Sequence, residues 1–301
     1  MARWGVPGGG PADVEAFEVA QRLCGAADGS AGLELTAMGP VLECRGGSCR
    51  VAVAAAGEVE AAVERGDGAR EALRTPRSVT LHPGDRLHVG AIRATLRAYV
   101  AVGGGIGVEA QLGSRNALLR GGTDGLLARG LRTGDELPTG GHDPDGPDLE
   151  LEPPAWLVDR SPLRITPGPQ ADRLGAAGRA ALEPSAIHRA GTDVDRTGVR
   201  LQGTPFGSLR GGADVATQGC PPGALQVTGD GSAILLGVDR GTTGGYAVPA
   251  VVASVDLPRL GRIRPGGLVR FQEVEVEAAE VLARARRRLL DSLGEMLRPV
   301  A

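Results

Sequence analysis

Lysine is absent from this chain of 301 residues, in which every basic side chain other than four histidines is an arginine. Without lysine the chain cannot form a lysine Schiff base, cannot place the lysine of a Walker-type loop on a nucleotide phosphate, and cannot carry covalently attached biotin. If the protein takes part in biotin chemistry, the biotin must therefore come from another chain.

Aromatic residues are also scarce, and the net charge is small. Phe, Trp and Tyr make up 2% of the chain, too few for a platform on which bases stack, and the formal charge of -3 argues against the basic surface that nucleic acids require. No stretch approaches the about 20 apolar residues of a membrane span, and the start MARWGVPGGG lacks the apolar run of a secretory signal. We therefore expect a cytoplasmic protein that binds neither nucleic acid nor membrane.

Cysteine and histidine are too few and too scattered to predict a metal site. The four cysteines, expected to be reduced in the cytoplasm, are Cys24, Cys44, Cys49 and Cys220. Cys44 and Cys49 flank the segment RGGS and are expected to face each other across a hairpin, but no second pair of ligands follows at the spacing of a zinc site. The histidines lie in four different sequence contexts, at His82, His88, His142 and His188. We therefore predict packing thiols, no metal, and no histidine-based triad.

Glycine, by contrast, is abundant, with 49 residues in 301. The glycines are dispersed among short apolar runs with no three-residue period, which excludes collagen and predicts many tight turns. Alternating runs beside these turns predict strands, and the segments PADVEAFEVAQRLCG and EAAEVLARARRRLLDSLGEMLRP show the period of helices. We expect a mainly β protein with a few helices, and a hairpin whose two strands flank RGGS.

The chain is long enough for two domains of ordinary size. Turn-then-strand units recur in both halves, as HPGDRLHVG, RTGDELPTG and RPGGLVRFQ, and the segment between the halves is rich in Pro, Gly and Asp. We predict a first β-rich subdomain with an N-terminal helix at residues 1–137, a linker or loop at 138–162, a second β-rich subdomain at 163–277 and a C-terminal helix at 278–301.

Several segments occur in an order that resembles the family of the 5-oxoprolinase C subunit, also called allophanate hydrolase subunit 2 or the biotin-dependent carboxyltransferase family. They include GVPGGGPAD, LRAYVAVGGGIGVEAQLGSR, PGPQAD, DVDRTGVRLQG and DRGTTGGY, and the resemblance extends from Gly5 to Phe271. It implies two cyclophilin-like β-barrel subdomains. It also implies a partner chain, the B subunit, which carries the other carboxyltransferase subdomain, and in some complexes a third chain, the A subunit.

The resemblance further implies a reaction on a small amide. Family members either hydrolyse the lactam 5-oxoproline to glutamate with ATP, or transfer a carboxyl group from carboxybiotin to urea; some relatives instead regulate a kinase by sequestering its inhibitor. Where the family has QTTGGYPK, this chain has GTTGGYAV, so that Gly241 and Val248 replace a glutamine and a lysine. This departure favours the alternative of a binding or regulatory module that pairs with a homologue of the B subunit. A carbohydrate-binding β protein ranks last, because few aromatic residues are present to stack on sugars.

The segment Thr242, Thr243, Gly244, Gly245 and Tyr246 is the predicted substrate-binding loop. Its glycines let backbone N–H groups approach an anion or a carbonyl, and the threonine hydroxyls add donors. The alternative is a wide turn between core strands, with Tyr246 as a packing residue.

Three charged residues are predicted to be catalytic. The guanidinium of Arg196, next to Asp195, is suited to bind a substrate carboxylate, although a surface ion pair explains the two residues equally well. Asp239 precedes the loop and either holds its turn or acts as a base.

Other positions are assigned to substrate binding or to capping. Gln170 is predicted to orient substrate from the start of a helix, at which Asp172 is more simply explained as the N-cap. Ser114 and Arg115 either bind an anion or form a turn that the serine caps. Asp13 is predicted to cap the first helix.

Overall fold

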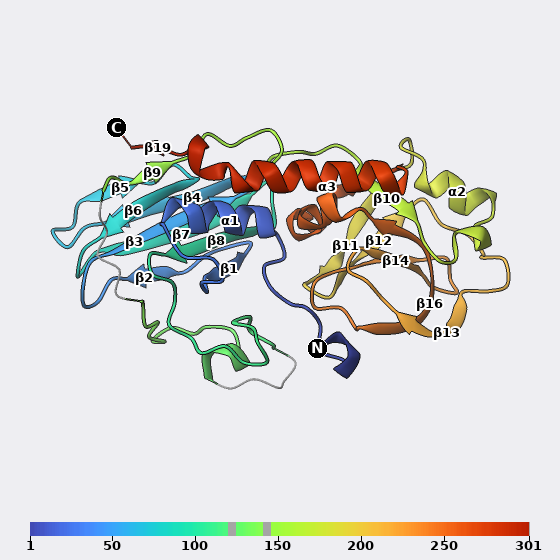
Figure 1. Ribbon diagram of the computed structural model, residues 1–301, viewed down its shortest axis with the longest axis horizontal. Coiled ribbons are helices and arrows are strands. Elements are labelled where there is room, and N and C mark those ends of the chain that lie inside the picture. Colours follow the sequence, from blue (N-terminus) through green and yellow to red (C-terminus); the bar gives the residue numbers. More distant parts are fainter. Residues whose placement is uncertain (120–124, 141–145, 301) are drawn as a thin grey trace. The chain divides into compact units, whose positions relative to one another are not determined.

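The computed structural model describes residues 1–119, 125–140 and 146–300. The chain divides into two compact units: unit 1 contains residues 1–13 and 160–288, and unit 2 contains residues 14–159 and 289–301. Strands dominate both units, and a helix lies close to the C-terminus (Figure 1). The predicted mainly β class and C-terminal helix are thus confirmed. The predicted domain boundaries and the cyclophilin-like barrel in each half stay predictions, and His142 lies outside the described residues.

Unit 1 is built on one strongly curved sheet. Among the described residues nine strands form it, in the order β17-β11-β12-β15-β14-β16-β10-β18, with β13 paired to β16. The strands are β10 (Leu163–Pro167), β11 (His188–Val194), β12 (Gly198–Gly203), β13 (Asp214–Gly219), β14 (Ala224–Val227), β15 (Ala233–Leu236), β16 (Thr243–Val252), β17 (Leu268–Val269) and β18 (Phe271–Glu273). Only Arg270 separates the edge strands β17 and β18 in sequence, so the two edges come together and the sheet nearly closes into a barrel.

The core of unit 1 is apolar, and its one buried histidine is satisfied within it. His188 is 1% exposed; its Nε2 lies 2.7 Å from the carbonyl oxygen of Ala181, and its ring stacks on Phe206 with centroids 5.4 Å apart. Burial lowers the pKa of His188, so the ring is neutral at pH 7 and donates its Nε2 proton to the carbonyl. The short helices of this unit are η1 (Ala2–Trp4), η3 (Ala171–Arg173), α2 (Ala176–Leu182) and η4 (Ser254–Arg262).

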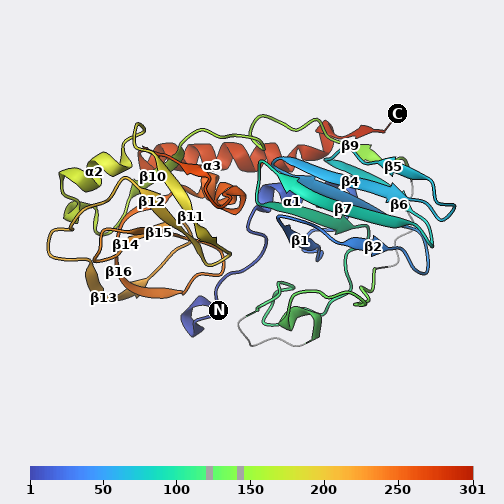
Figure 2. The same cartoon turned by 180° about the vertical axis from the view of Figure 1, so that it is seen from behind.

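Unit 2 contains two sheets around a shared core. In the part of the chain that the structure describes, one sheet has the order β1-β8-β3-β6-β9-β19 and the other has the order β2-β7-β4-β5. Figure 2 shows strands of both sheets in this unit, among them β4, β6 and β7. Their strands are β1 (Leu33–Thr36), β2 (Val41–Glu43), β3 (Cys49–Ala55), β4 (Glu58–Glu64), β5 (Arg70–Ala72), β6 (Arg77–Leu81), β7 (Arg86–Arg93), β8 (Arg97–Val102), β9 (Leu149–Glu150) and β19 (Arg298–Pro299). The short helix η2 (Gly125–Ala128) also belongs to this unit.

Strand β3 supplies side chains to two cores, because alternate residues of a strand point to opposite faces. Val51 and Val53 pack in the cluster between the two sheets, whereas Ala52 and Ala54 pack in a second cluster. The second cluster also contains residues of helix α1 (Val14–Leu23), which therefore covers the outer face of the larger sheet. This confirms the predicted first helix.

The predicted hairpin around RGGS is wrong. Strand β2 pairs with β7, whereas β3 pairs with β6 and β8, so the two strands that flank RGGS lie in different sheets. The reason is burial. Strand β3 is buried, so the backbone N–H and C=O groups along both of its edges must be hydrogen-bonded, and they pair with β6 and β8, whereas β2 is an exposed edge strand.

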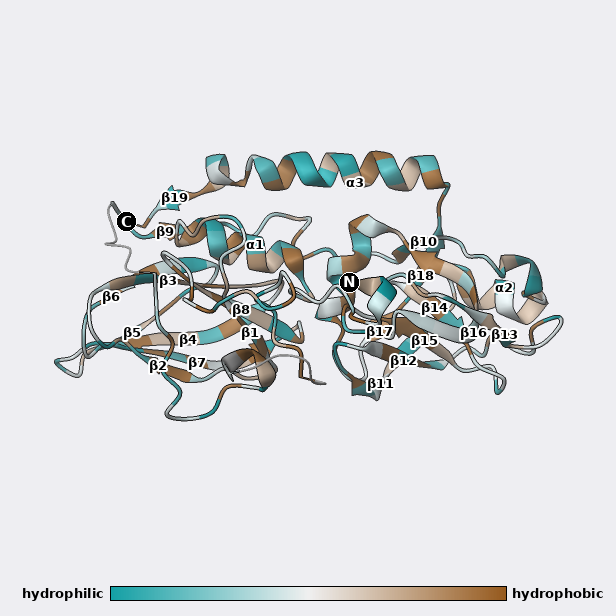
Figure 3. Ribbon diagram, turned by 60° about the horizontal axis from the view of Figure 1, so that its bottom comes forward, coloured by the Kyte–Doolittle hydropathy of each residue, from teal (hydrophilic) through white to brown (hydrophobic). Residues whose placement is uncertain are grey.

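The C-terminal helix is shorter than predicted. Helix α3 (Val276–Asp291) ends ten residues before the C-terminus, and η5 (Leu293–Met296) follows it. Near the end of α3, Leu290 is buried, at 5% exposed, whereas the adjacent Leu289 is 43% exposed. Figure 3 shows hydrophilic residues along much of α3. No described helix is both long and apolar enough to cross a bilayer.

Candidate functional site

The predicted binding loop is largely a strand. Residues 243–246 form the first four residues of β16, because β13 offers them a pairing partner: Gly219 lies opposite Thr243, and Gln218 lies opposite Gly244. We call Thr242–Tyr246 the glycine segment. It is not sealed in the interior, since Thr243 is exposed and the side chain of Tyr246 is 41% exposed.

Gly244 is required by what lies beneath the glycine segment. A Cβ atom at this position would lie 2.5 Å from Nε2 of Gln226 and 3.0 Å from Sγ of Cys220. These two side chains are buried, and Gln226 Nε2 donates to Cys220 Sγ at 3.3 Å. The glycine therefore lets the strand lie directly on this polar pair.

Gln170 lies beside the glycine segment, as a positioning residue for the strands. Its Nε2 donates to Oε1 of Gln218 at 3.1 Å, and Gln218 Nε2 returns a bond to Gln170 Oε1 at 3.1 Å. The backbone N–H of Val248 also donates to Gln170 Oε1, at 2.9 Å. The N-cap prediction for Asp172 is wrong: it lies within η3, whose cap residue is Gln170 and has no side-chain capping bond.

Arg196 and Asp239, distant in sequence, form a two-point ion pair in unit 1. Nε and Nη2 of Arg196 lie 2.7 and 3.0 Å from the two carboxylate oxygens of Asp239, and Nη2 also donates to the carbonyl oxygen of Gly10 at 2.8 Å. Both side chains are largely buried, so this is more than a surface ion pair. Direct contact of either residue with substrate stays a prediction.

Asp195 is used in a turn. Its Oδ1 accepts the backbone N–H groups of Thr197 and Gly198, at 2.6 and 3.0 Å, and thereby fixes the connection between β11 and β12. This turn carries Arg196. Asp195 itself is exposed.

The N-terminal segment, residues 1–13, is also fixed in unit 1 by its last residues. Nε and Nη2 of Arg262 bind the two carboxylate oxygens of Asp13 at 2.7 and 3.1 Å, with both side chains buried. A Cβ atom on Gly261 would meet the carbonyl oxygen of Ala12 at 2.5 Å, so the backbones can approach only at a glycine. Helix α1 begins directly after Asp13, at Val14.

Arg240 is the residue that sequence reasoning missed. Its Nε donates to the carbonyl oxygen of Cys220 at 2.8 Å, and its Nη1 donates to that of Val238 at 3.4 Å. The backbone N–H of Cys220 in turn donates to the carbonyl oxygen of Thr242, so Arg240 is joined through one residue to the glycine segment. In the sequence Arg240 directly follows Asp239, which suggests that the two neighbours neutralise each other. In the structure, however, the carboxylate of Asp239 binds Arg196.

The charge of Arg240 has no counter-ion within unit 1 as described. Among the described residues its guanidinium donates to two backbone carbonyl oxygens, and no carboxylate is among the groups that shift its pKa; the residue is half-buried. Burial lowers the pKa of Arg240, and the Cys220 thiol opposes this effect. A guanidinium in this setting is suited to bind a carboxylate or a polarised carbonyl oxygen.

Val248 faces the core. It is 2% exposed and packs with Cys220, Ala224 and Leu236. The position at which the family pattern has lysine therefore points inward in this protein. Val248 lies outside the glycine segment, and its side chain contributes to the core.

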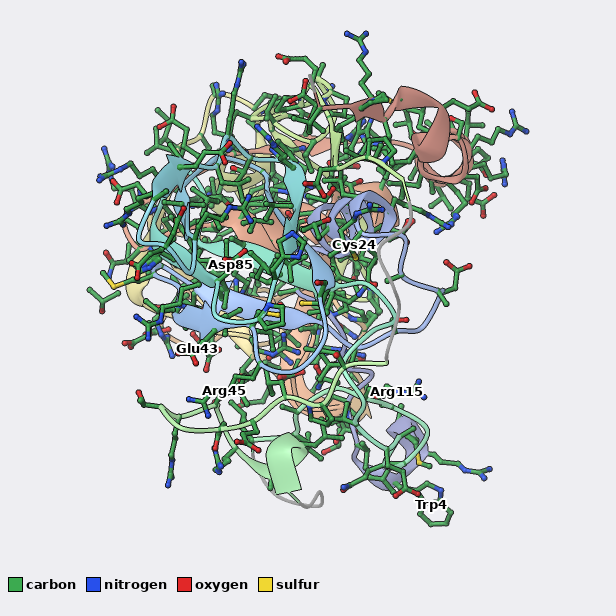
Figure 4. The ribbon with its side chains drawn as sticks, turned by 90° about the vertical axis from the view of Figure 1, so that its left-hand side faces the viewer. Trp4, Cys24, Glu43, Arg45, Asp85 and Arg115 are labelled. Atoms are coloured by element: carbon green, nitrogen blue, oxygen red, sulfur yellow. The ribbon has the colours of Figure 1, made fainter. Side chains whose placement is uncertain are left out.

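Ser114 and Arg115 belong to unit 2. Figure 4 labels Arg115 among the side chains. Ser114 Oγ accepts the backbone N–H of Asn116 at 3.1 Å, and Arg115 donates to the carbonyl oxygens of Val108 and Gly29 at 3.1 and 3.2 Å. These bonds support the turn alternative. In the part of the chain described here, no group of three or more His, Cys, Asp and Glu is placed to hold a metal ion.

Comparison with known proteins adds relatives of known class. A family model described as carboxyltransferase domain, subdomain A and B, matches residues 4–273. The chain is 30% identical over 211 residues to the C subunit of the 5-oxoprolinase of Escherichia coli, a match that covers 70% of this chain and 67% of that protein. It is 26% identical over 320 residues to the urea amidolyase of Lachancea kluyveri, covering 97% of this chain but 17% of that protein.

A solved structure of a urea enzyme is also similar to this chain. The crystal structure of the Kluyveromyces lactis urea carboxylase matches with a TM-score of 0.81 at 25% identity, and the match covers 97% of this chain and 27% of that chain. The chain therefore corresponds to a small part of the urea enzymes.

Proposed function

The chain belongs to the carboxyltransferase domain, subdomain A and B, family, and from this premise we propose that it is the counterpart of the 5-oxoprolinase C subunit in an enzyme acting on a small amide or ureido substrate. A homologue of the B subunit, and in a three-chain complex also one of the A subunit, completes the enzyme. The reaction is either ATP-dependent opening of a lactam such as 5-oxoproline or carboxyl transfer to a urea-type nitrogen. ATP binds in the complex, and biotin is supplied by another chain, since this one has no lysine.

One observation carries the proposal: an exposed, glycine-opened strand lies next to a half-buried arginine with no carboxylate partner among the described residues. We infer that Arg240 binds a carboxylate or carbonyl oxygen of the substrate. The hydroxyls of Thr242, Thr243 and Tyr246 supply further hydrogen bonds to it.

In this proposal Arg196 and Asp239, which were predicted to be catalytic, position the residues that bind substrate. The Arg196–Asp239 pair fixes the turn that leads into Arg240, because the N–H of Asp239 also donates to the carbonyl oxygen of Arg196 at 2.9 Å. Gln170 and Gln218 hold β13 against the glycine segment. Both carboxylate oxygens of Asp239 accept bonds from Arg196, so we assign Asp239 to positioning.

The proposal is tested by turnover in the complete complex. The chain is purified with homologues of the A and B subunits and assayed for ATP-dependent conversion of 5-oxoproline to glutamate, and separately for carboxyl transfer to urea. Arg240→Gln should lower kcat/KM by about 10- to 100-fold, the equivalent of losing one charged hydrogen bond. Arg200→Gln, which removes an exposed arginine of β12, is the matched control and should have no effect. A folded complex that turns over neither substrate would contradict the proposal.

A binding or regulatory module is the second candidate. It is favoured by the engagement of Arg196, whose guanidinium binds Asp239 and Gly10 within the chain itself. In that case the chain binds a homologue of the B subunit tightly, Tyr246→Ala leaves this affinity unchanged, and the wild-type complex has no turnover. Loss of turnover in Tyr246→Ala with affinity retained would support the enzyme instead.

A further inference from the structure

Two thiols of unit 2 lie next to each other. The Sγ atoms of Cys44 and Cys49 are 3.7 Å apart, and both cysteines are free. In a disulfide the two sulfurs are about 2 Å apart, so a small rotation of the side chains would bring them within bonding distance.

A disulfide between Cys44 and Cys49 would link the two sheets of unit 2. Cys44 follows β2, in the four-stranded sheet, whereas Cys49 is the first residue of β3, in the six-stranded sheet. Both cysteines pack at the core that these sheets enclose. The chain passes from one sheet to the other between them, through the four residues RGGS.

The connecting segment can adapt to the bond. Residues 45–48 have the sequence RGGS, Gly46 has a φ of 91°, and added Cβ atoms on Gly46 and Gly47 would meet nothing within 4 Å. Cys44 is buried, with Sγ 3.4 Å from the carbonyl oxygen of Gly47, whereas Cys49 is partly exposed. A reagent can therefore reach the pair from the side of Cys49.

We propose that Cys44 and Cys49 form a reversible disulfide that covalently joins the two sheets of unit 2. This inference is independent of the proposed function. It assigns to the thiols a modification by small disulfides such as oxidised glutathione.

The reaction is balanced by ordinary thiol–disulfide exchange. One protein thiolate attacks a sulfur of glutathione disulfide and expels one glutathione thiolate. The second protein thiolate then attacks the mixed disulfide and expels the other, so the protein loses two hydrogens and two glutathione molecules are reduced. Excess reduced glutathione reverses both steps.

The surroundings indicate a slow structural exchange and not a catalytic thiol. Burial, followed by the neighbouring Cys44, raises the pKa of Cys49 to about 12, so Cys49 is held as the thiol at neutral pH. A zinc site is a poor alternative, since two thiols are too few ligands and no third ligand joins them within the described residues.

The test uses the full chain and its other cysteines as internal controls. The protein is incubated with glutathione disulfide, alkylated with iodoacetamide, digested and analysed by mass spectrometry. We expect a peptide in which Cys44 and Cys49 are unalkylated and linked, with a mass loss of about 2 Da for the two hydrogens. Cys24 donates to the carbonyl oxygen of Gln21, and neither it nor Cys220 lies beside another cysteine in the described part of the chain, so neither should be linked.

Two outcomes would overturn the inference: alkylation of both Cys44 and Cys49 to the level of the untreated protein, or a stable glutathione adduct on either one. Cys44→Ser and Cys49→Ser should each convert the product to a mixed disulfide or to unmodified protein. A melting temperature that rises by about 4 °C on oxidation of the wild type, and not of these variants, is expected from closing a short loop. An unchanged melting temperature of the linked protein would contradict the joining of the two sheets.

Discussion

Gly244 is the residue at which the glycine segment is most sensitive to a single added atom. Gly244→Ala would place Cβ against the buried side chains of Gln226 and Cys220, and we expect it to reduce the free energy of unfolding by about 1–3 kcal/mol. Gly245→Ala is the matched control, because its nearest contact is the carbonyl oxygen of Val215 at 3.6 Å, an ordinary van der Waals distance. Urea unfolding followed by circular dichroism measures both, and equal losses would contradict the close packing beneath Gly244.

Asp256 is a buried carboxylate that makes the stability of unit 1 depend on pH in acid. It is 0% exposed; Arg164 binds both of its oxygens at 2.8 and 2.5 Å, and Arg259 lies 3.1 Å away. Burial alone would raise the pKa of Asp256, but the bonds from Arg164 and the charge of Arg259 outweigh it, so the pKa is lowered. Its contribution to stability is therefore complete above the pKa of an unfolded aspartate, and it is lost as the pH falls through the lower, folded value.

Asp256→Asn should therefore cost about 3–5 kcal/mol at pH 7, because it leaves two arginines without their carboxylate in a buried site. The cost should shrink as the pH falls below the ordinary range of carboxyl groups. Glu280→Gln is the control, since it removes one partner of an exposed pair with Arg284 and should change stability by less than about 0.5 kcal/mol. Unfolding free energies across a pH series measure this, and a cost that is constant down to the acid limit would count against it.

Residue types and their order in the sequence led to the hypothesis of a site at Thr242–Tyr246, but they did not reveal how the charged residues beside it are paired. The adjacency of Asp239 and Arg240 suggests a neutral pair, yet Asp239 binds Arg196, which is 43 positions away. Likewise, no local pattern reveals that Val248 packs on Cys220 and Leu236. Such pairings depend on which strands become neighbours, and this is decided by the whole barrel.

At the scale of elements, local sequence patterns predicted that helices and strands exist but did not predict which strands pair with each other. The apolar period predicted α1, and the short runs beside glycine turns predicted that strands make up most of the chain. The predicted hairpin across RGGS is wrong because both edges of the buried strand β3 are occupied by β6 and β8, which follow it in the chain and leave no edge for β2. The glycine segment is a strand and not the predicted loop because it pairs with β13, and this pairing is equally invisible in a local pattern.

The N-terminal segment is an element whose attachment can be measured. The guanidinium of Arg196 binds both Asp239 and the carbonyl oxygen of Gly10. Removal of Arg196 deletes the bond to Gly10, and removal of Asp239 releases the guanidinium that makes it, so both changes should weaken the attachment of the N-terminal segment. We expect Arg196→Ala and Asp239→Ala to be non-additive, with a coupling free energy of about 0.5–3 kcal/mol in a double-mutant cycle. Each single variant should also speed proteolysis before Asp13. Additive effects within about 0.3 kcal/mol would show that the two side chains act separately.

At the scale of the whole chain, each unit is completed by a terminus that is distant in sequence. Unit 1 takes residues 1–13 in addition to 160–288, and unit 2 takes 289–301 in addition to 14–159. The order of motifs along the chain predicted the family, since that order survives without any knowledge of contacts. It could not predict this division, because the two crossing segments are held by residues distant in sequence, as Asp13 is by Arg262, and no motif reveals such a contact.

Leu293 tests whether the C-terminal residues are part of the core of unit 2. It is 0% exposed and lies in a cluster with Val19, Leu23 and Tyr99, against which Trp156 packs. Leu293→Ala should therefore destabilise unit 2 by about 2–5 kcal/mol, whereas Leu289→Ala, at a side chain 43% exposed, should cost less than about 0.5 kcal/mol.

The two tryptophans make this measurement specific to one unit. Trp4 belongs to unit 1 and is 72% exposed, whereas Trp156 belongs to unit 2 and is partly buried in the Leu293 cluster. In a Trp4→Phe background, fluorescence reports only Trp156, so the urea midpoint that it records is that of unit 2. A midpoint that Leu293→Ala leaves unchanged would mean that residues 289–301 only lie on the surface of this unit. A large shift would mean that they are part of its core, so that their deletion would unfold the unit.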